Sequence, residues 1–437
     1  MTTTDNRETP AASPDPQPAS RLELSSWMSF DFANSSYTTV IVTVAFAPYF
    51  ANTVASEGNG EFLWGLAKAT SEGLVVLSAP IVGAIADFTA RKKLFLVITF
   101  LGCVAGTACL GLVGPGEVAL GFGLFVVSNM FFSSGENLIA AFLPEITTPD
   151  KMGRISGYGW AVGYLGGLVS LAACLGVMDF SDPAAMKLVC LMVAGFFLIG
   201  GLPTMLFLKE RARPKPLAVG ERLVSAGFRR VGKTVRRVRE YKQLYRFLLS
   251  FLLYNAGVQT VIVFASIFAQ KAIGMTAGQI VIFFLVSQLS AALGALGFGF
   301  LQDSVGAQKS IIASLVIWIL VCVGAYFATT ASAFYVVGNL AGLAMGSAQS
   351  GGRALVGTFS PVHRAAEFFG FWGIFAKLSA GLGPLAFATW SHFFGIRISI
   401  LLTGIFFALG VVGMLFVDEK EGRETAIRNS RGLGGDD

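Results

Sequence analysis

The sequence predicts an all-α membrane protein with twelve transmembrane helices arranged in two six-helix bundles. Of its 437 residues, 54% are hydrophobic and only 13% are charged, whereas soluble domains carry roughly 25% charged residues. Twelve apolar stretches reach the roughly 17 to 25 residues that a spanning helix requires. Landmarks recur about 216 residues apart, which indicates that one six-helix unit is present twice.

The apolar stretches divide the chain into two bundles. The first bundle is expected at 25–208, after a disordered cytoplasmic tail at 1–24, and the second at 243–420, before a cytoplasmic tail at 421–437. In chain order, the expected spans are 29–54, 62–86, 94–114, 118–142, 154–178, 186–208, 246–270, 276–301, 309–328, 332–356, 367–390 and 395–417.

The internal repeat rests on three landmarks. Asp87 and Asp303 each close a Gly-x-x-x-Asp sequence after an apolar stretch and lie 216 residues apart. Pro144 and Pro361 each end a stretch and lie 217 apart. The glycine- and aromatic-rich segment 156–167 aligns with 369–380 at an offset of 213. Two halves with the same landmarks in the same order suggest a pseudo-two-fold axis along the membrane normal.

The distribution of basic residues predicts the orientation. Cytoplasmic loops carry an excess of Lys and Arg, whereas the loop 52–61 has two Glu and no basic residue. Both termini are therefore expected in the cytoplasm. The basic residues that support this follow the second, fourth and tenth spans: Arg91, Lys92, Lys93, Lys151, Arg154 and Arg364.

The linker 209–242 separates the bundles and holds twelve Lys or Arg against three Glu. Within 217–241, apolar residues recur at helical spacing among the cations, which is typical of an amphipathic helix on an anionic membrane surface. We expect anionic lipids, and no nucleic acid, as its partner. The apolar positions are Leu223, Val224, Phe228, Val231 and Val235.

Twelve spans in two halves, a basic central linker and the repeated Gly-x-x-x-Asp signal resemble the major facilitator superfamily. The first copy, GAIADFTARKK, departs from the usual pattern at Phe88 and at Ala90, where Gly is common; the second copy keeps Gly306. Three further segments resemble the vacuole-effluxer branch: 29–50, AAFLPEI at 140–146, and the run 346–423. This resemblance covers residues 25–423.

The resemblance implies a secondary transporter that moves a small organic solute by alternating access. The branch contains fungal vacuolar amino-acid exporters, which implies an amino acid or a related metabolite, with protons as a possible coupling ion. A proton-coupled exporter of drug-like or amphipathic compounds is the alternative. A non-transporting receptor or a lipid scramblase is a third class, and solute counterflow in proteoliposomes would exclude it.

Ionisable residues inside spans are costly and so require a partner or a function. Asp31 and Asn34 share one face of the first span, either as substrate contacts or as helix-end polarity that offsets the dipole. Glu72 lies about 15 Å into the second span at 1.5 Å per residue. It is either a carboxylate that couples transport to protons or the structural partner of Lys68, one turn earlier.

Glu136 and Arg353 lie 217 residues apart, at equivalent positions of spans four and ten. Opposite charges there could pair across a central cavity, or each could be satisfied within its own half, by Asn137 and by Gln349. Lys377 lies in span eleven, and its counterpart in the first half is Tyr164. It could contact a substrate carboxylate, pair with Glu136 or extend to the interface.

A second group of residues lies at the membrane surface. The resemblance implies that Gly83, Asp87, Arg91 and Asp303 help to lock one alternating-access state, with Asp87 facing the N-terminus of a neighbouring helix. Glu367, at the start of span eleven, is the expected partner of Arg91.

The sequence does not predict an enzyme, because it contains no Ser-His-Asp set, HExxH motif or P-loop. The five cysteines all lie in apolar stretches without paired spacing, so neither a disulfide frame nor a metal site is expected. No cofactor is expected either. We expect a monomer in the bacterial cytoplasmic (inner) membrane.

Overall fold

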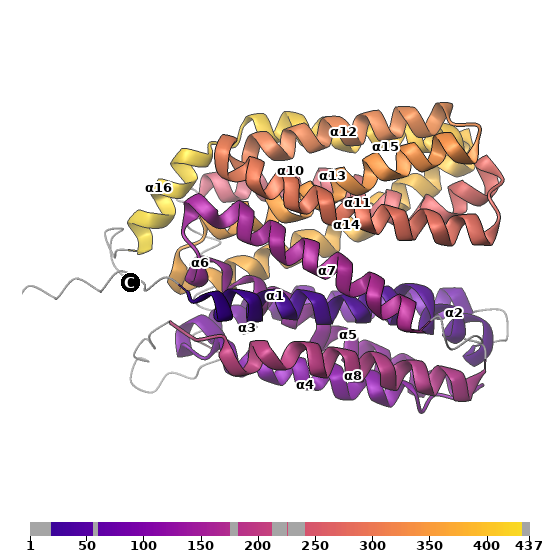
Figure 1. The fold of residues 1–437 in the computed structure, drawn as a ribbon, viewed down its shortest axis with the longest axis horizontal. Coiled ribbons are helices and arrows are strands. Elements are labelled where there is room, and N and C mark those ends of the chain that lie inside the picture. The colour runs from indigo at the N-terminus through magenta and orange to yellow at the C-terminus, as the bar shows by residue number, and fades with distance from the viewer. Residues whose placement is uncertain (1–18, 56–59, 175–181, 212–224, 226–240, 431–437) are drawn as a thin grey trace, which may run out of the picture.

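A computed structural model describes residues 19–55, 60–174, 182–211, 225 and 241–430. Within these ranges the chain folds into helices and their connections, with no strand. Helices suit a membrane because each backbone group is bonded within its own segment. Figure 1 shows two helix bundles side by side along the long axis, with the indigo-to-magenta helices in one and the orange-to-yellow helices in the other.

The first bundle contains residues up to 207. Its first helical run is continuous in direction but includes two π-helical segments, η1 and η2, and π-helical turns are frequent at functional sites. The elements are α1 (Arg21–Ser36), η1 (Tyr37–Val44), α2 (Phe46–Tyr49), η2 (Phe50–Val54), α3 (Gly60–Thr89), α4 (Lys92–Leu110), α5 (Val118–Ala140), α6 (Leu143–Ile146), η3 (Pro149–Lys151), α7 (Met152–Cys174) and α8 (Pro183–Phe207).

The second bundle begins at Lys242 and ends in a short helix beyond the last span. Its elements are α10 (Lys242–Phe268), η4 (Ala269–Ile273), α11 (Ala277–Val305), α12 (Ala307–Phe327), α13 (Ala331–Phe359), η5 (Val362–Arg364), α14 (Ala365–Phe394), α15 (Ile396–Leu415) and α16 (Glu419–Ser430). The end of the molecule that carries the start of α1, α6 and α16 is called the α16 end (Figure 1).

Eleven helical segments of the described chain are long and apolar enough to cross a membrane. The remaining expected span is α7, a 23-residue helix with six glycines and several polar residues among its apolar ones. The first helix begins at Arg21, earlier than the expected residue 29. The predicted amphipathic helix at 217–241 lies outside the described residues, apart from residues 225 and 241.

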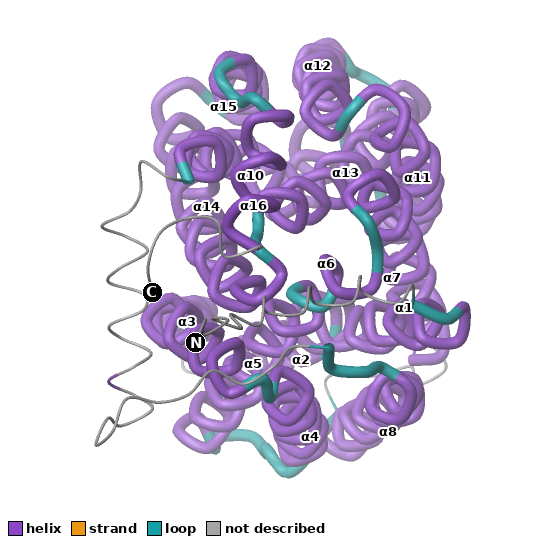
Figure 2. The backbone as a smooth tube through the Cα atoms, turned by 90° about the vertical axis from the view of Figure 1, so that its left-hand side faces the viewer, coloured by secondary structure: helices purple, strands orange, loops and turns teal. Residues whose placement is uncertain are grey.

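The two bundles meet through equivalent helix pairs, α3 with α14 and α7 with α11. Figure 2 views the molecule from the α16 end and shows the helices of both bundles around a common centre. Small residues permit close approach of the helices. A Cβ atom at Gly83 would lie 2.3 Å from the carbonyl oxygen of Ala366, and one at Gly157 would lie 2.4 Å from that of Ala295.

Two equivalent turns follow α3 and α11. Ala90 has φ +52° and Gly306 has φ +96°, with ψ 151°, and these residues are 216 apart. A left-handed conformation costs an L-residue about 1–2 kcal/mol, and the conformation of Gly306 is nearly restricted to glycine. The turn therefore requires the same backbone reversal in both halves, and Ala90 adopts it at a cost.

Ala90→Gly is expected to raise the free energy of unfolding by about 0.5–1 kcal/mol. The substitution removes the left-handed strain, which outweighs the extra freedom that glycine gives the unfolded chain. Thermal unfolding in detergent would measure the change. The reciprocal variant Gly306→Ala should lower stability, and an Ala90→Gly protein less stable than wild type would contradict this account.

Candidate functional site

A cavity of about 330 Å³ lies between the two bundles. Pockets for small ligands occupy roughly 300–1,000 Å³, so this cavity suits a small metabolite. Its walls come from α1, η1, α3, α5 and α7 of the first bundle and from α10, α13 and α14 of the second. The π-helical segment η1 contributes Thr38 and Val42. A ligand bound here would contact both bundles at once.

Arg353 on α13 crosses to the first bundle and is almost completely buried. Its Nη1 atom donates to Asp31 Oδ2 on α1 at 2.6 Å. Nη2 donates to the carbonyl oxygen of Ser156 at 2.9 Å, and Nε donates to the Ser156 hydroxyl at 3.1 Å. The guanidinium also lies 4.6 Å from the ring centre of Trp27 and 5.4 Å from that of Trp160. These contacts compensate the desolvation of a buried cation.

A second ion pair joins α3 to α14 on another wall. Lys377 Nζ lies 2.9 Å from Glu72 Oε2, and it also donates to the Ser133 hydroxyl at 3.2 Å. Lys68 lies one helical turn from Glu72, with 3.8 Å between Nζ and Oε1. Asn129 Nδ2 is 3.5 Å from the same carboxylate. Glu72 is therefore held by two cations from opposite bundles.

The expected ion pair between Glu136 and Arg353 is wrong for this conformation. Both residues line the cavity, but the partner of Arg353 is Asp31. The alternative in which each charge is satisfied within its own half also fails for Arg353, because Asp31 belongs to the first bundle. Glu136 makes no hydrogen bond and no ion pair within 4 Å with another described residue.

The other predicted cavity residues also face this space. Asn34, Asn137, Gln349 and Lys377 all line it. The amide nitrogen of Asn137 is buried and has no hydrogen-bond partner among the described residues. Lys377 does not extend to the interface, because Glu72 and Ser133 hold its ammonium group inside the bundle. Its expected partner Glu136 is replaced by Glu72.

The cavity is separated from the α16 end by contacts between the bundles. Asp87, at the end of α3, accepts a hydrogen bond from the Glu367 backbone N–H in the first turn of α14, at 2.9 Å. Asp303, at the end of α11, accepts from Arg154 N at 3.1 Å and from Arg154 Nε at 3.0 Å in the first turn of α7. A carboxylate at a helix N-terminus satisfies free N–H groups and the dipole. The two halves thus use the same device.

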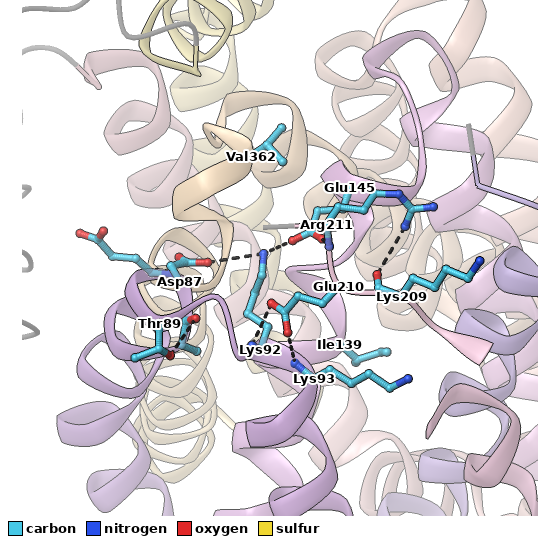
Figure 3. Close-up of polar contacts among 12 residues, drawn as sticks. Asp87, Thr89, Lys92, Lys93, Ile139, Glu145, Lys209, Glu210, Arg211 and Val362 are labelled. Carbon is cyan, nitrogen blue, oxygen red and sulfur yellow. Dashed lines mark hydrogen bonds and ion pairs between the residues drawn. The ribbon is translucent and has the colours of Figure 1, made fainter. Parts of the chain in front are cut away.

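Lys92 lies at the centre of the α16 end. Its ammonium group is fully buried, pairs with Glu145 of α6 and lies 3.5 Å from Asp87 Oδ1. Glu145 Oε2 in turn accepts from Arg211 N at 3.1 Å. Arg211 forks onto Glu23 of α1, with distances of 2.5 and 2.7 Å. Figure 3 shows this network running from Asp87 through Lys92 and Glu145 to Arg211.

Two carboxylates after the last helix of each bundle bind the start of another helix. Glu210 accepts from the Lys92 and Lys93 backbone N–H groups, each at 2.9 Å (Figure 3). Glu419 accepts from Ala307 N at 3.2 Å and Gln308 N at 3.0 Å. Burial raises the pKa of Glu210, although the two N–H donors act in the opposite direction.

The expected pair between Arg91 and Glu367 is wrong. Arg364, three residues before Glu367, donates to its carboxylate from Nε at 3.0 Å and from Nη2 at 2.9 Å. Arg91 is exposed and makes no ion pair with a described residue. The neighbouring Lys92, which the orientation argument treated as an ordinary cytoplasmic charge, takes the buried position instead. Glu23, Glu145, Glu210 and Arg211 were likewise missed.

These features define a transporter of the major facilitator type, with two equivalent bundles around a central polar cavity. The fold agrees with that of the human organic anion transporter MFSD10 (TM-score 0.74, 15% identity, 91% of this chain and 100% of that one). It also agrees with FucP in the outward conformation (TM-score 0.71, 13% identity, 91% and 98%).

The chain belongs to the Atg22-like vacuole effluxer family, whose model matches residues 62–427. It is 29% identical over 408 residues to the uncharacterized MFS-type transporter YxiO of Bacillus subtilis strain 168, covering 90% of this chain and 94% of that protein. The predicted fold and family are therefore confirmed. Because the family and fold are those of transporters, the prediction that the chain is not an enzyme is confirmed as well.

The Asp31–Arg353 pair should dominate a double-mutant cycle. Removing one partner of a buried pair typically costs about 3–5 kcal/mol, whereas removing both costs much less. We therefore expect Asp31→Asn with Arg353→Gln to show a coupling energy of about 1–3 kcal/mol in the free energy of unfolding, measured by denaturant titration in micelles. The matched cycle of Glu136→Gln with Arg353→Gln should give a smaller value. Equal coupling in both cycles would show that the assignment of partners is incorrect.

Proposed function

We propose that this protein moves a small zwitterionic solute, an amino acid or a related metabolite, across the bacterial cytoplasmic membrane by alternating access. The observation that carries the proposal is the cavity between the bundles, lined by three acidic and three basic side chains. A charged ligand would unbalance this set, whereas a zwitterion leaves it neutral. The six are Asp31, Glu72, Glu136, Lys68, Arg353 and Lys377.

We infer that the α16 end faces the cytoplasm. Basic residues at this end, such as Arg91, Lys151 and Arg154, agree with the rule that positive charge stays inside. The contacts made by Asp87 and Asp303 close this end between the bundles. The cavity would then be accessible from the opposite side, which is the state that loads or releases solute outside the cell. Opening the α16 end would complete the cycle.

Proton coupling is assigned to Glu136 in this proposal. Two cations surround Glu72, so its ionised form has electrostatic partners. Glu136 has no such partner within 4 Å among the described residues, and an isolated charge inside a membrane protein is costly. Uptake of a proton removes that cost, whereas uptake of a proton by Glu72 would leave Lys377 and Lys68 uncompensated. The structure thus favours the pairing interpretation of Glu72 over the coupling one.

Reconstitution in proteoliposomes tests this function. With a pool of labelled L-amino acids, the wild-type protein should show counterflow and accumulation driven by a pH gradient. Glu136→Gln should keep counterflow but lose the response to the gradient, because it cannot bind or release a proton. Glu72→Gln should impair both activities, because it leaves Lys377 without its carboxylate.

Glu424→Gln provides the matched control, since Glu424 is exposed on α16 and distant from the cavity lining. It should behave as wild type. If Glu136→Gln still accumulates solute in response to a pH gradient, the coupling assignment is wrong. Complete absence of counterflow in the wild-type protein, for amino acids and for amphipathic compounds alike, would contradict the transport function itself.

A further inference from the structure

Helices α5 and α14 come from different bundles and run against each other at the cavity. Lys377 Nζ of α14 contacts the Ser133 hydroxyl of α5 at 3.2 Å. One turn along both helices, a Cβ atom at Gly373 would lie 2.7 Å from the Asn137 amide nitrogen. Asn137, Gly373 and Lys377 therefore form one continuous seam, and all three line the cavity.

Two hydrogen-bond donors on this seam have no acceptor. Asn137 is only 8% exposed, and neither its Nδ2 atom nor Trp372 Nε1 has a hydrogen-bond partner among the described residues. A buried donor without a partner typically costs about 1–3 kcal/mol, and such groups call for an explanation in a folded protein. Both residues line the cavity, so a ligand there can reach them.

The seam also carries a positive charge. Lys377 is shared with Glu72, so the local excess of charge is small and suits a monoanion better than a multiply charged group. Arg353 is a poorer candidate, because Asp31 and Ser156 already accept hydrogen bonds from its guanidinium. Neutral donors bind a charged oxygen more strongly than a neutral one. A carboxylate fits two neutral donors beside one cation.

We propose that the seam between α5 and α14 binds the carboxylate of the transported solute, with Asn137 and Trp372 as hydrogen-bond donors and Lys377 as the cation. This inference rests on the proposed function and specifies how that site selects its substrate. Because Asn137 belongs to the first bundle and Trp372 to the second, one carboxylate connects both. Solutes that lack it, such as amino-acid amides, would lose this connection.

Ligand-induced thermal stabilisation of the purified full-length protein tests the proposal. A mixture of the common L-amino acids should raise the midpoint of unfolding, whereas the same mixture as α-carboxamides should not. For the most effective amino acid, Trp372→Phe should weaken binding roughly tenfold to a hundredfold, the loss expected for one hydrogen bond to a charged group. Asn137→Asp should abolish binding, because it places a carboxylate against a carboxylate.

Trp318→Phe is the matched control. Trp318 Nε1 is also buried without a hydrogen-bond partner in the described chain, but its ring stacks on Phe407 outside the cavity lining. Its affinity should equal that of wild type. The proposal is overturned if amides stabilise as well as acids, if both tryptophan variants lose affinity equally, or if no acid stabilises the protein. Counterflow of amides by the wild-type protein would leave the transport function standing and remove only the carboxylate site.

Discussion

The closed end of this transporter depends on one buried cation, Lys92. A lysine without a partner in a water-poor site is costly, and Asp87 and Glu145 supply the compensating charge. Asp87 also binds the first turn of α14, in the other bundle. The contact between bundles therefore shares a carboxylate with the charge balance of Lys92. Separation of α3 from α14 at this end would weaken both together, which favours two discrete states over gradual opening.

The same two helices are joined again inside the cavity. Glu72 of α3 pairs with Lys377 of α14, fifteen residues before Asp87 on the same helix. At about 1.5 Å per residue, the two contacts lie roughly 22 Å apart along α3. A solute or proton that alters the inner pair changes the geometry of helices that also form the outer one. This arrangement provides a physical connection between the cavity and the α16 end.

Much of the fold could be predicted from the sequence, because hydropathy and an internal repeat depend only on local composition and order. The repeat also indicated the equivalent roles of Asp87 and Asp303. The partners of buried charges were less accessible, because they depend on how each helix is rotated about its axis. Arg353 was expected to meet Glu136 by symmetry, yet the rotation of α1 and α13 brings it to Asp31.

Lys92 was missed for a different reason. It lies among three consecutive basic residues that also define membrane orientation, and nothing in that run shows which one is buried. Its equivalents differ in the second half: Gln308 stands 216 residues after Lys92, and Val362 stands 217 after Glu145. The charged centre is thus confined to one half, although the helix-capping carboxylates Glu210 and Glu419 occur in both.

Distances between spin labels across the α16 end test the role of Lys92 most directly. Labels at Arg91 and Val362, both exposed and in opposite bundles, should report a single short distance in a cysteine-free background. Lys92→Gln should shift much of the population to longer distances, because Asp87 and Glu145 lose their shared cation. Lys93→Gln should leave the distribution unchanged, since only the backbone of Lys93 contacts Glu210. If Lys92→Gln gives the wild-type distribution, Lys92 does not hold this end closed.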